Sequence, residues 1–356
     1  MPTINDVCRA MESWAPLQWQ ESYDNAGLLI GNKHQEVSGI LTTLDCTEEV
    51  IKEAIAKNCN VIIAHHPIIF KGLKSITGKN YVEKTVLAAI KNDIAIYASH
   101  TNLDHAPQGV SYHLAKKLGI NGQVLSPLQD ALKKLSFYVP IQQQDIVRNA
   151  LHEAGAGNIG EYSSCSFTVE GEGRFTPSVN SNPTIGVTNQ AEKVHEVKIE
   201  MIFPKHLENI ILQALINAHP YEEVAYFIHS LDNSWKEVGA GFIGELPEAL
   251  EEDDFIKYVK EKLEIRFLRH TPQINRKIKK VAVCGGAGSF LIKQAIAAGA
   301  DAYITGDIKY HEFFDAENHL LLMDVGHYES EVMIKEAMCS YLSNIFCNFA
   351  VLKSEI

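Results

Sequence analysis

The sequence has no Cys-x-x-Cys pair, although it contains seven cysteines. An odd number of scattered cysteines is typical of buried thiols in a reducing compartment. The N-terminus lacks a basic head with an apolar stretch, and no apolar run of about 18 residues occurs anywhere. We therefore expect a cytoplasmic protein with no membrane partner.

The chain also has fewer basic residues than acidic residues. The chain has 32 lysines and arginines against 44 aspartates and glutamates, a net charge of −12. An acidic surface repels phosphate backbones, and no cluster of lysines and arginines offers a local exception. We expect no nucleic-acid partner, and a role as a DNA-related adaptor is disfavoured.

The length of 356 residues, with 46% hydrophobic residues, suggests about two domains and a large core without disulfides. In the first third, short apolar runs rich in β-branched residues alternate with segments of helical spacing. The strand-like runs are residues 37–44, 61–64 and 94–98, and the helical segments are 48–57 and 81–91. This alternation is typical of a mostly parallel sheet covered by helices on both faces.

The same alternation returns in the last third of the chain. Strand-like segments lie at residues 281–284, 302–305 and 320–323, and helical segments at 289–298 and 329–342. The predicted fold class is therefore α/β, with a two-lobed core built on mostly parallel sheets.

The middle of the chain has a different pattern. Strand, helix and strand occur twice, with predicted strands at 135–140, 160–169, 194–203 and 222–231 and predicted helices at 145–154 and 204–218. This order indicates an inserted ferredoxin-like α+β domain. The predicted boundaries are residues 1–128 for the first lobe, 129–236 for the insert and 237–356 for the second lobe. A stretch rich in Gly, Ser, Asn and Pro, residues 171–192, is either a mobile loop or a rigid excursion.

Chemically useful side chains follow several predicted strands. His65 and His66 come directly after one strand, and Asp104 comes shortly after another. His327 and Glu331 are four residues apart at the start of a predicted helix, so both project from one face. Loops at the carboxyl ends of strands form the ligand crevice of open α/β sheets, so these residues are candidates for one site.

A set of histidines and carboxylates suits one or two divalent ions such as zinc, iron or manganese. For any one of these residues, a satisfied hydrogen-bonding role or a solvated loop position is the alternative. The combination favours metal, because adjacent histidines at a strand end and a second His-x-x-x-Glu motif have no obvious packing purpose.

Six motifs, in this order along the chain, resemble the GTP cyclohydrolase 1 type 2 homolog family, whose members are also called Nif-three-like metal proteins. They are Asp24-Asn-Ala-Gly27, Ile63-Ala-His65-His66-Pro67, Ser99-His-Thr-Asn-Leu-Asp104, Cys284-Gly-Gly-Ala-Gly288, Gly306-Asp307-Ile-Lys-Tyr-His311 and Gly326-His327-Tyr-Glu-Ser-Glu331. The resemblance covers residues 1–128 and 237–356. After Asp104 the chain has only Gly109 where the family commonly has two glycines, which affects the following turn alone.

The resemblance implies a dinuclear metal site with Glu331 as the bridging carboxylate. The ligands it implies are His65, His66, Asp104, His327 and Glu331. It also implies a homohexamer, a trimer of dimers, that acts on a small-molecule substrate. Longer family members carry an insert like the PII and CutA proteins, and His219-Pro-Tyr-Glu-Glu223 is similar to the signature of that domain.

Several neighbours of the predicted ligands are candidates for supporting roles. Asp45, Asp307 and His311, together with Asp24 and Asn25, orient ligands or serve as turn and capping residues. His100, Asp307 or His311 would shuttle a proton. The glycines of the segment 285–288 either cradle a phosphate or form a tight turn, and Cys46 and Cys284 are expected to be inert.

Two functions remain open from the sequence. In the first, the chain is a metal-dependent hydrolase acting on a nucleotide or a related cyclic amide or phosphate. In the second, it is a metal-binding regulatory or scaffold protein whose insert senses a small ligand. Five protein ligands for two metals leave coordination positions for water, which favours the enzyme.

Overall fold

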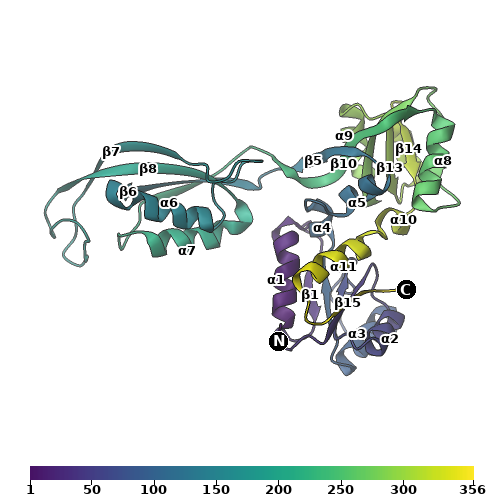
Figure 1. Ribbon diagram of the computed structural model, residues 1–356, viewed down its shortest axis with the longest axis horizontal. Coiled ribbons are helices and arrows are strands. Elements are labelled where there is room, and N and C mark those ends of the chain that lie inside the picture. Colours follow the sequence, from purple (N-terminus) through teal and green to yellow (C-terminus); the bar gives the residue numbers. More distant parts are fainter. The chain divides into compact units, whose positions relative to one another are not determined.

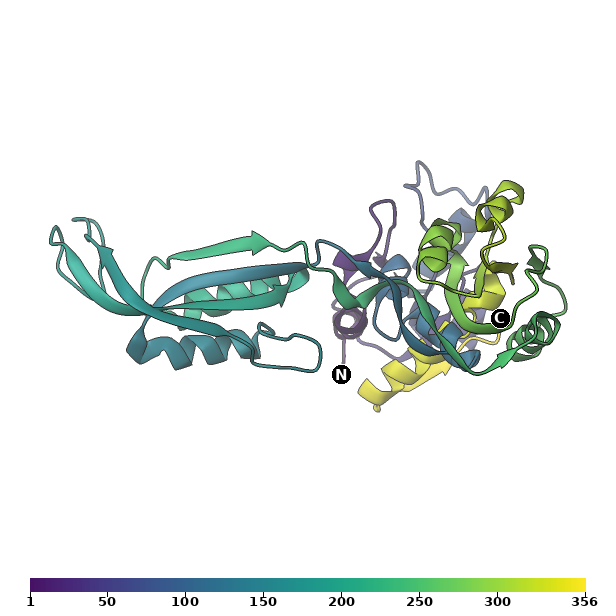
Figure 2. The same ribbon diagram turned by 90° about the horizontal axis from the view of Figure 1, so that it is seen from above.

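The computed structural model describes all residues from Met1 to Ile356. The chain forms two compact units. One consists of Met1–Pro127 together with Lys236–Ile356, and the other is Leu128–Trp235. Figures 1 and 2 show the elements of each unit in two views. No helix in the chain has both the length and the apolar character needed to cross a bilayer.

The first sheet of the larger unit has the strand order β1-β4-β3-β2-β15. The strands β2, β3, β4 and β15 run parallel to their neighbours, and β1 is antiparallel to β4. Their bounds are β1 Gly27–Ile30, β2 Gly39–Thr43, β3 Val61–Ala64, β4 Ala95–Ala98 and β15 Ala350–Lys353. The mostly parallel prediction holds for this sheet.

Helices on both faces bury these strands. The side chains of Leu41 and Ile62 pack against α2 and α3 on one face, and Thr42 donates from the other face to the carbonyl of Lys335 in α11. Thr47 and Asn80 cap α2 and α3. The helices of this lobe are α1 Ile4–Trp14, η1 Leu17–Trp19, α2 Glu48–Ala56, α3 Tyr81–Lys91, α4 Thr101–His105 and α5 Val110–Lys117.

The second sheet has the order β11-β14-β13-β12-β10-β5 and is mixed rather than mostly parallel. The pairs of β12 with β13 and of β13 with β14 are parallel, whereas β10 and β11 pair antiparallel with β12 and β14. The eight-residue β5 and the sixteen-residue β10 carry little strand signal in the sequence. The strands are β5 Asn121–Leu128, β10 Trp235–Leu250, β11 Arg269–His270, β12 Ile278–Ala287, β13 Ala302–Gly306 and β14 Leu321–Asp324.

The segment expected as one helix at 329–342 forms two helices, and the chain end returns to the first sheet. Strand β15 pairs in parallel with β2, so the last strand of the chain belongs to the first sheet. The backbone of Ser354 donates to Thr42 and anchors this end. The remaining helices are α8 Glu252–Leu263, η4 Ser289–Leu291, α9 Ile292–Ala297, η5 Tyr310–Ala316, α10 His327–Glu331 and α11 Ile334–Ile345.

The smaller unit has the element order β-α-β-β-α-β, with all four strands antiparallel in the order β7-β8-β6-β9. Helices α6 and α7 cover one face of this sheet (Figure 1), and they bury a cluster that includes Phe137, Ile199 and Leu215. The bounds are β6 Leu132–Pro140, η2 Ile141–Gln143, α6 Gln144–Glu153, β7 Phe167–Phe175, β8 Glu192–Pro204, η3 Lys205–Leu207, α7 Glu208–Ala218 and β9 Tyr226–Ser230.

One strand of this unit lies later than predicted. β7 begins at Phe167 instead of residue 160, because the residues before it form a turn in which Gly160 and Ser164 have positive φ. β7 then continues to Phe175, inside the stretch expected to be irregular. Residues 176–191 connect β7 to β8 without forming a strand or helix of their own.

Candidate metal centre

Five side chains from distant parts of the larger unit converge at one place. His65 and His66 follow the buried strand β3, Asp104 lies in the short helix α4, and His327 and Glu331 are the first and last residues of α10. The backbone of His66 donates to the carbonyl of Leu44, which fixes the turn after β3. The carboxyl ends of parallel strands thus bring together residues up to 266 positions apart in the sequence.

His65 is completely buried, and its ring is fixed from behind. Its Nδ1 donates to the carbonyl oxygen of Ser99 at 2.8 Å, so Nε2 carries the lone pair. Nε2 lies 3.6 Å from Asp104 Oδ1 and 3.8 Å from Glu331 Oε1. His65 Nε2 and Asp104 Oδ1 are buried polar atoms without a hydrogen-bond partner. Such atoms are costly unless something binds between them, so they fit a cation.

The site has two halves: His65 and Asp104 form the first, and His66 and His327 form the second, in which three ligand atoms lie at hydrogen-bond distance from one another. Glu331 Oε2 lies 3.0 Å from His66 Nε2 and 3.1 Å from His327 Nε2. The two imidazole nitrogens are themselves 3.2 Å apart. Three acceptor atoms this close together require a positive charge among them, either protons or a metal ion.

Glu331 belongs to both halves. Its Oε1 faces His65 and Asp104, and its Oε2 faces His66 and His327. The ligand atoms of each group, His65 with Asp104 and Glu331, and His66 with His327 and Glu331, lie within 4.8 Å of one another. One carboxylate shared by two groups is the arrangement expected of a bridging ligand. These residues can hold a metal ion.

Every histidine of the centre is held through Nδ1. His66 donates to Asp45 at 2.9 Å, and His327 donates to Asp307 at the same distance. His100 donates to Asp24 at 2.7 Å, and its ligand nitrogen lies within 4.8 Å of those of His65 and His66. Hydrogen bonds from Nδ1 to carboxylates fix the tautomer that presents Nε2, and they raise the basicity of a metal ligand.

The charges in the centre shift its pKa values strongly. Burial alone would lower the pKa of His66, but hydrogen bonds to Asp45 and Glu331 outweigh burial and raise it from 6.5 to about 10. The hydrogen bond to Glu331 raises the pKa of His327 to about 9. Burial raises the pKa of Asp104, whereas the three histidines hold the pKa of Glu331 below its usual range despite burial. Without metal, protons take the place of the cation.

Metal binding is therefore expected to release protons. At pH 7 the metal-free protein carries protons on His66 and His327, whose pKa values are about 10 and about 9, and both must leave before Nε2 can bind a metal. Titration calorimetry at pH 7 in buffers of different ionisation enthalpy should show about two protons released from these imidazoles, together with a fraction of one from Asp104, whose pKa burial raises to about 7, and affinity should rise towards pH 9. Zero release would contradict this assignment.

The same pKa values set the pH dependence of the metal-free fold. His66 and His327 bind protons more tightly in the folded state than in the unfolded state, so their protonation stabilises the fold. This stabilisation is complete below the ordinary histidine pKa of 6.5, and it is lost as the pH rises through the folded-state pKa values of about 9 and about 10. Thermal unfolding of metal-free protein should accordingly show a lower melting temperature at pH 10 than at pH 7. Metal-loaded protein, whose imidazoles are already neutral, should lack this decrease.

The glycines after β12 form a tight turn against the centre. The amides of Gly285, Gly286 and Gly288 donate to the hydroxyls of Ser111, Ser330 and Thr305, so they are not available to a phosphate. Gly286 has φ +62°, and a Cβ there would lie 2.2 Å from Glu331 Oε1. The turn interpretation is therefore supported, and these glycines make room for the shared carboxylate.

The other predicted residues lie at different distances from the centre. Asp45 and Asp307 contact His66 and His327, as described. His311 is exposed in η5, and its ring lies beside Tyr310 and Phe314 and outside the converging groups. The carbonyl of Ser99 was not predicted, because a backbone oxygen has no signal in a sequence.

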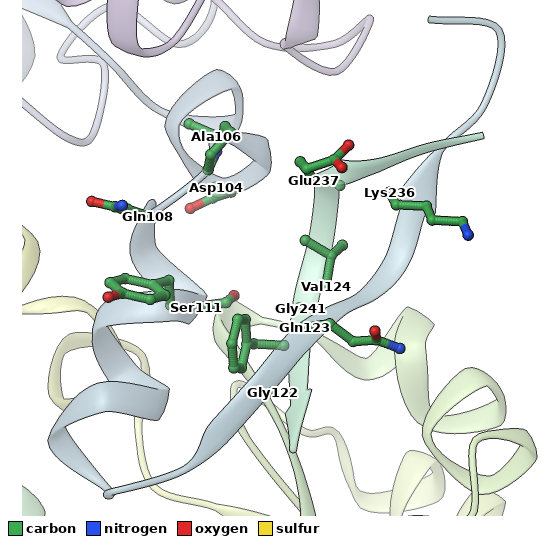
Figure 3. A pocket seen from close by; sticks show the side chains of 14 residues that line it. Asp104, Ala106, Gln108, Ser111, Gly122, Gln123, Val124, Lys236, Glu237 and Gly241 are labelled. Carbon is green, nitrogen blue, oxygen red and sulfur yellow. The ribbon is translucent and has the colours of Figure 1, made fainter. Parts of the chain in front are cut away.

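A cavity of about 380 Å³ lies next to Asp104 (Figure 3). The segment of α4 and α5 forms one wall, with Gln108, Ser111 and Tyr112, and strands β5 and β10 form the other. Such a volume is within the range of small-molecule sites. Asp104 is the only one of the five converging residues that lines this cavity.

A family model and individual relatives of this chain point to the same protein family. The family model Duf34/NIF3 (NGG1p interacting factor 3) matches residues 2–356. The chain is 41% identical over 345 residues to a Bacillus subtilis protein named GTP cyclohydrolase 1 type 2 homolog, covering 96% of this chain and 92% of the relative.

Solved structures of members of this family have the same fold as this chain. A Bacillus cereus protein related to NIF3 has a TM-score of 0.88 at 40% identity, covering 100% of this chain and 97% of that one. A Staphylococcus aureus protein has a TM-score of 0.78 at 33% identity, covering 99% and 96%. With a family model over almost the whole chain, relatives of similar length and a matching fold, the chain belongs to the Duf34/NIF3 family.

Proposed function

We propose that this protein is a metal-dependent hydrolase that holds two divalent ions, zinc, iron or manganese. The observation that carries the proposal is the sharing of Glu331 between two groups of ligand atoms. His65 and Asp104 would hold one ion, His66 and His327 the other, with Glu331 between them. Imidazole and carboxylate ligands suit these metals.

Two such ions supply hydroxide from water at neutral pH and stabilise a developing oxyanion. The residues of the chain then have distinct tasks. Asp45 and Asp307 orient the rings of His66 and His327, and the carbonyl of Ser99 orients His65. Five protein ligands for two ions leave open positions, as catalytic centres require.

His100 is our candidate for proton transfer to the leaving group. Its Nδ1 donates to Asp24, which leaves Nε2 facing the centre to accept or deliver a proton. Replacing His100 by Asn should lower kcat by about 10² to 10⁴ while the metal content stays unchanged. Loss of metal with activity would instead make His100 a ligand. The exposed His311, replaced in the same way, is the matched control.

The substrate we propose is a nucleotide or a related cyclic amide or phosphate. The name of the Bacillus subtilis relative refers to GTP cyclohydrolase, and the cavity beside Asp104 has room for a small molecule. Gln108 and Ser111 are among the polar residues that line this cavity, and hydrogen-bonding side chains of this kind fix the orientation of a bound polar molecule.

A substrate screen tests the proposal. Protein loaded in turn with zinc, manganese or iron, the last under anaerobic conditions, is incubated with GTP, phosphodiesters and cyclic amides. We expect turnover of one class that depends on added metal. If no class turns over with any metal while the centre is fully loaded, the hydrolase proposal fails.

The second candidate is a metal-binding regulatory or scaffold protein whose insert senses a small ligand. A cavity of about 830 Å³ in the smaller unit favours it. In that case, loss of metal would alter only the assembly or the response to the ligand. We further propose that the insert is related to PII and CutA proteins, consistent with its β-α-β-β-α-β order.

Assembly and location complete the proposal. We propose a homohexamer, a trimer of dimers, with no nucleic-acid partner at a net charge of −12. All seven cysteines are free thiols, which supports a reducing compartment such as the cytoplasm. Light scattering after size exclusion should give a mass of about six chains, and a monomer would contradict this.

A further inference from the structure

A cavity of the smaller unit lies on the face of its sheet that α6 and α7 leave uncovered. It has a volume of about 830 Å³, and strands β7 and β8, the segment 176–185 and residues 221–223 contribute to its lining. The core side chains Val197 and Ile199 point towards the helices. Glu196, next to Val197 in the same strand, therefore points to the opposite face.

The segment His219-Pro-Tyr-Glu-Glu223 builds one side of this cavity. His219 Nε2 donates to the carbonyl of Tyr138, and its Nδ1 accepts from the amide of Tyr221. The loop after β7 is tied to the same segment, because Asn182 donates to Glu222 and Thr184 donates to the carbonyl of Pro220. The segment thus holds the loop in place beside the cavity, a role unrelated to the metal centre.

Glu196 is the unusual residue of this cavity. It is only 8% exposed, and the hydroxyl of Tyr221 donates to its Oε1 at 2.9 Å. A Cβ at Gly173 would lie 2.0 Å from Oε2, so glycine at that position makes room for the carboxylate. Glu196 takes part in none of the ion pairs of the chain. A buried carboxylate without a cationic partner is costly, which indicates that a cation arrives from outside.

The rest of the lining does not supply that cation. Glu222 and Glu223 add negative charge, and the lining residue Arg174 is paired with Glu172 at 2.7 Å. His219 is held as a neutral ring by its two hydrogen bonds, and burial lowers its pKa. The cavity therefore carries an excess of negative charge around a fixed carboxylate.

The composition of the lining distinguishes an organic cation from a metal ion. Groups of three histidine, cysteine or carboxylate ligands that could hold a metal occur only at the centre in the larger unit. Aromatic rings, however, line the same cavity: Tyr221, whose hydroxyl donates to Glu196, lies 6.0 Å from Phe175 with the two ring planes at 62°. A carboxylate beside aromatic faces is the environment in which proteins bind ammonium groups.

We propose that this cavity binds a small organic molecule with a protonated amine, which pairs with Glu196 and lies against Tyr221 and Phe175. The cavity volume is within the range of small-molecule sites. The proposal is independent of the chemistry at the metal centre.

Titration calorimetry of the full chain tests this proposal with three probes. Spermidine represents polyamines, arginine amide represents amino-acid cations, and butane-1,4-diol is the neutral control. At least one cation should bind, and Glu196→Gln should weaken its binding at least about tenfold, because the buried charge pair is lost. Glu200→Gln, on the same strand and face but outside the cavity, should bind as the unaltered protein does.

Two further variants separate the possible outcomes. Glu331→Gln should leave binding of the cation unchanged, whereas a loss would show that the amine binds at the metal centre and would overturn the proposal. Tyr221→Phe, which removes only the hydroxyl that holds Glu196, should weaken binding severalfold even if Glu196→Gln fails to fold. The proposal is also overturned if neither cation binds, if the diol binds equally well, or if folded Glu196→Gln retains full affinity.

Discussion

Replacing Glu331 by glutamine is expected to remove metal from both halves of the centre at once. The amide keeps the size of the side chain, but its nitrogen cannot bind a cation and its oxygen cannot serve two groups. Because Glu331 faces His65 through Oε1 and His66 through Oε2, both ligand groups lose a carboxylate. Metal affinity measured by elemental analysis after dialysis against a chelator should fall at least about hundredfold.

The neighbouring helix provides a control for this substitution. Glu336→Gln in α11 changes an exposed carboxylate that pairs with Lys353, and it should retain metal. Circular dichroism should show that both variants are folded. If Glu331→Gln keeps its full metal content, the carboxylate is not a ligand and the two-ion proposal loses its main support.

Replacing Gly286 by alanine should damage the centre without touching any ligand. The new Cβ would lie 2.2 Å from Glu331 Oε1, closer than real side chains approach, so the carboxylate must move away from His65 and Asp104. Gly286 also has φ +62°, where a non-glycine residue costs about 1–2 kcal/mol. We expect metal affinity to fall at least about tenfold, and the melting temperature to fall as well.

Gly299→Ala separates the two effects. Gly299 has φ +72°, but no atom lies within 4 Å of the position that a Cβ would occupy, so alanine there carries the backbone strain alone. Gly286→Ala should lose at least as much stability as Gly299→Ala, and only Gly286→Ala should lose metal. Equal metal content in the two variants would mean that Glu331 can shift without leaving the centre.

Glu331→Gln and Gly286→Ala both test how the carboxylate of Glu331 is held in the centre. Glu331 ends a helix of only one turn, and the hydroxyl of Ser330 beside it accepts from the amide of Gly286. The turn after β12 and helix α10 therefore hold the shared carboxylate together. Positioning of this kind depends on backbone contacts as much as on the ligands themselves.

Much of the first lobe could be predicted from local patterns. Strands such as Val61–Ala64 are buried on both faces, so they appear as continuous apolar runs, and α2 and α3 have clear helical spacing and caps. Strands β5, β10 and β15 were not predicted, because pairing with neighbouring strands, rather than the pattern of their own residues, makes them strands. The second sheet is mixed for the same reason: sequence periodicity does not record strand direction.

The sequence by itself determined the kind of chemistry available, because histidine and carboxylate side chains after buried strands have few other uses than binding cations or protons. Only the tertiary structure decided which of them meet. It separated His311 from the centre, placed the carbonyl of Ser99 behind His65, and turned the two oxygens of Glu331 towards different partners. It also revealed Glu196 as a buried carboxylate, since burial depends on the strands and loops packed around a residue and not on its neighbours in the sequence.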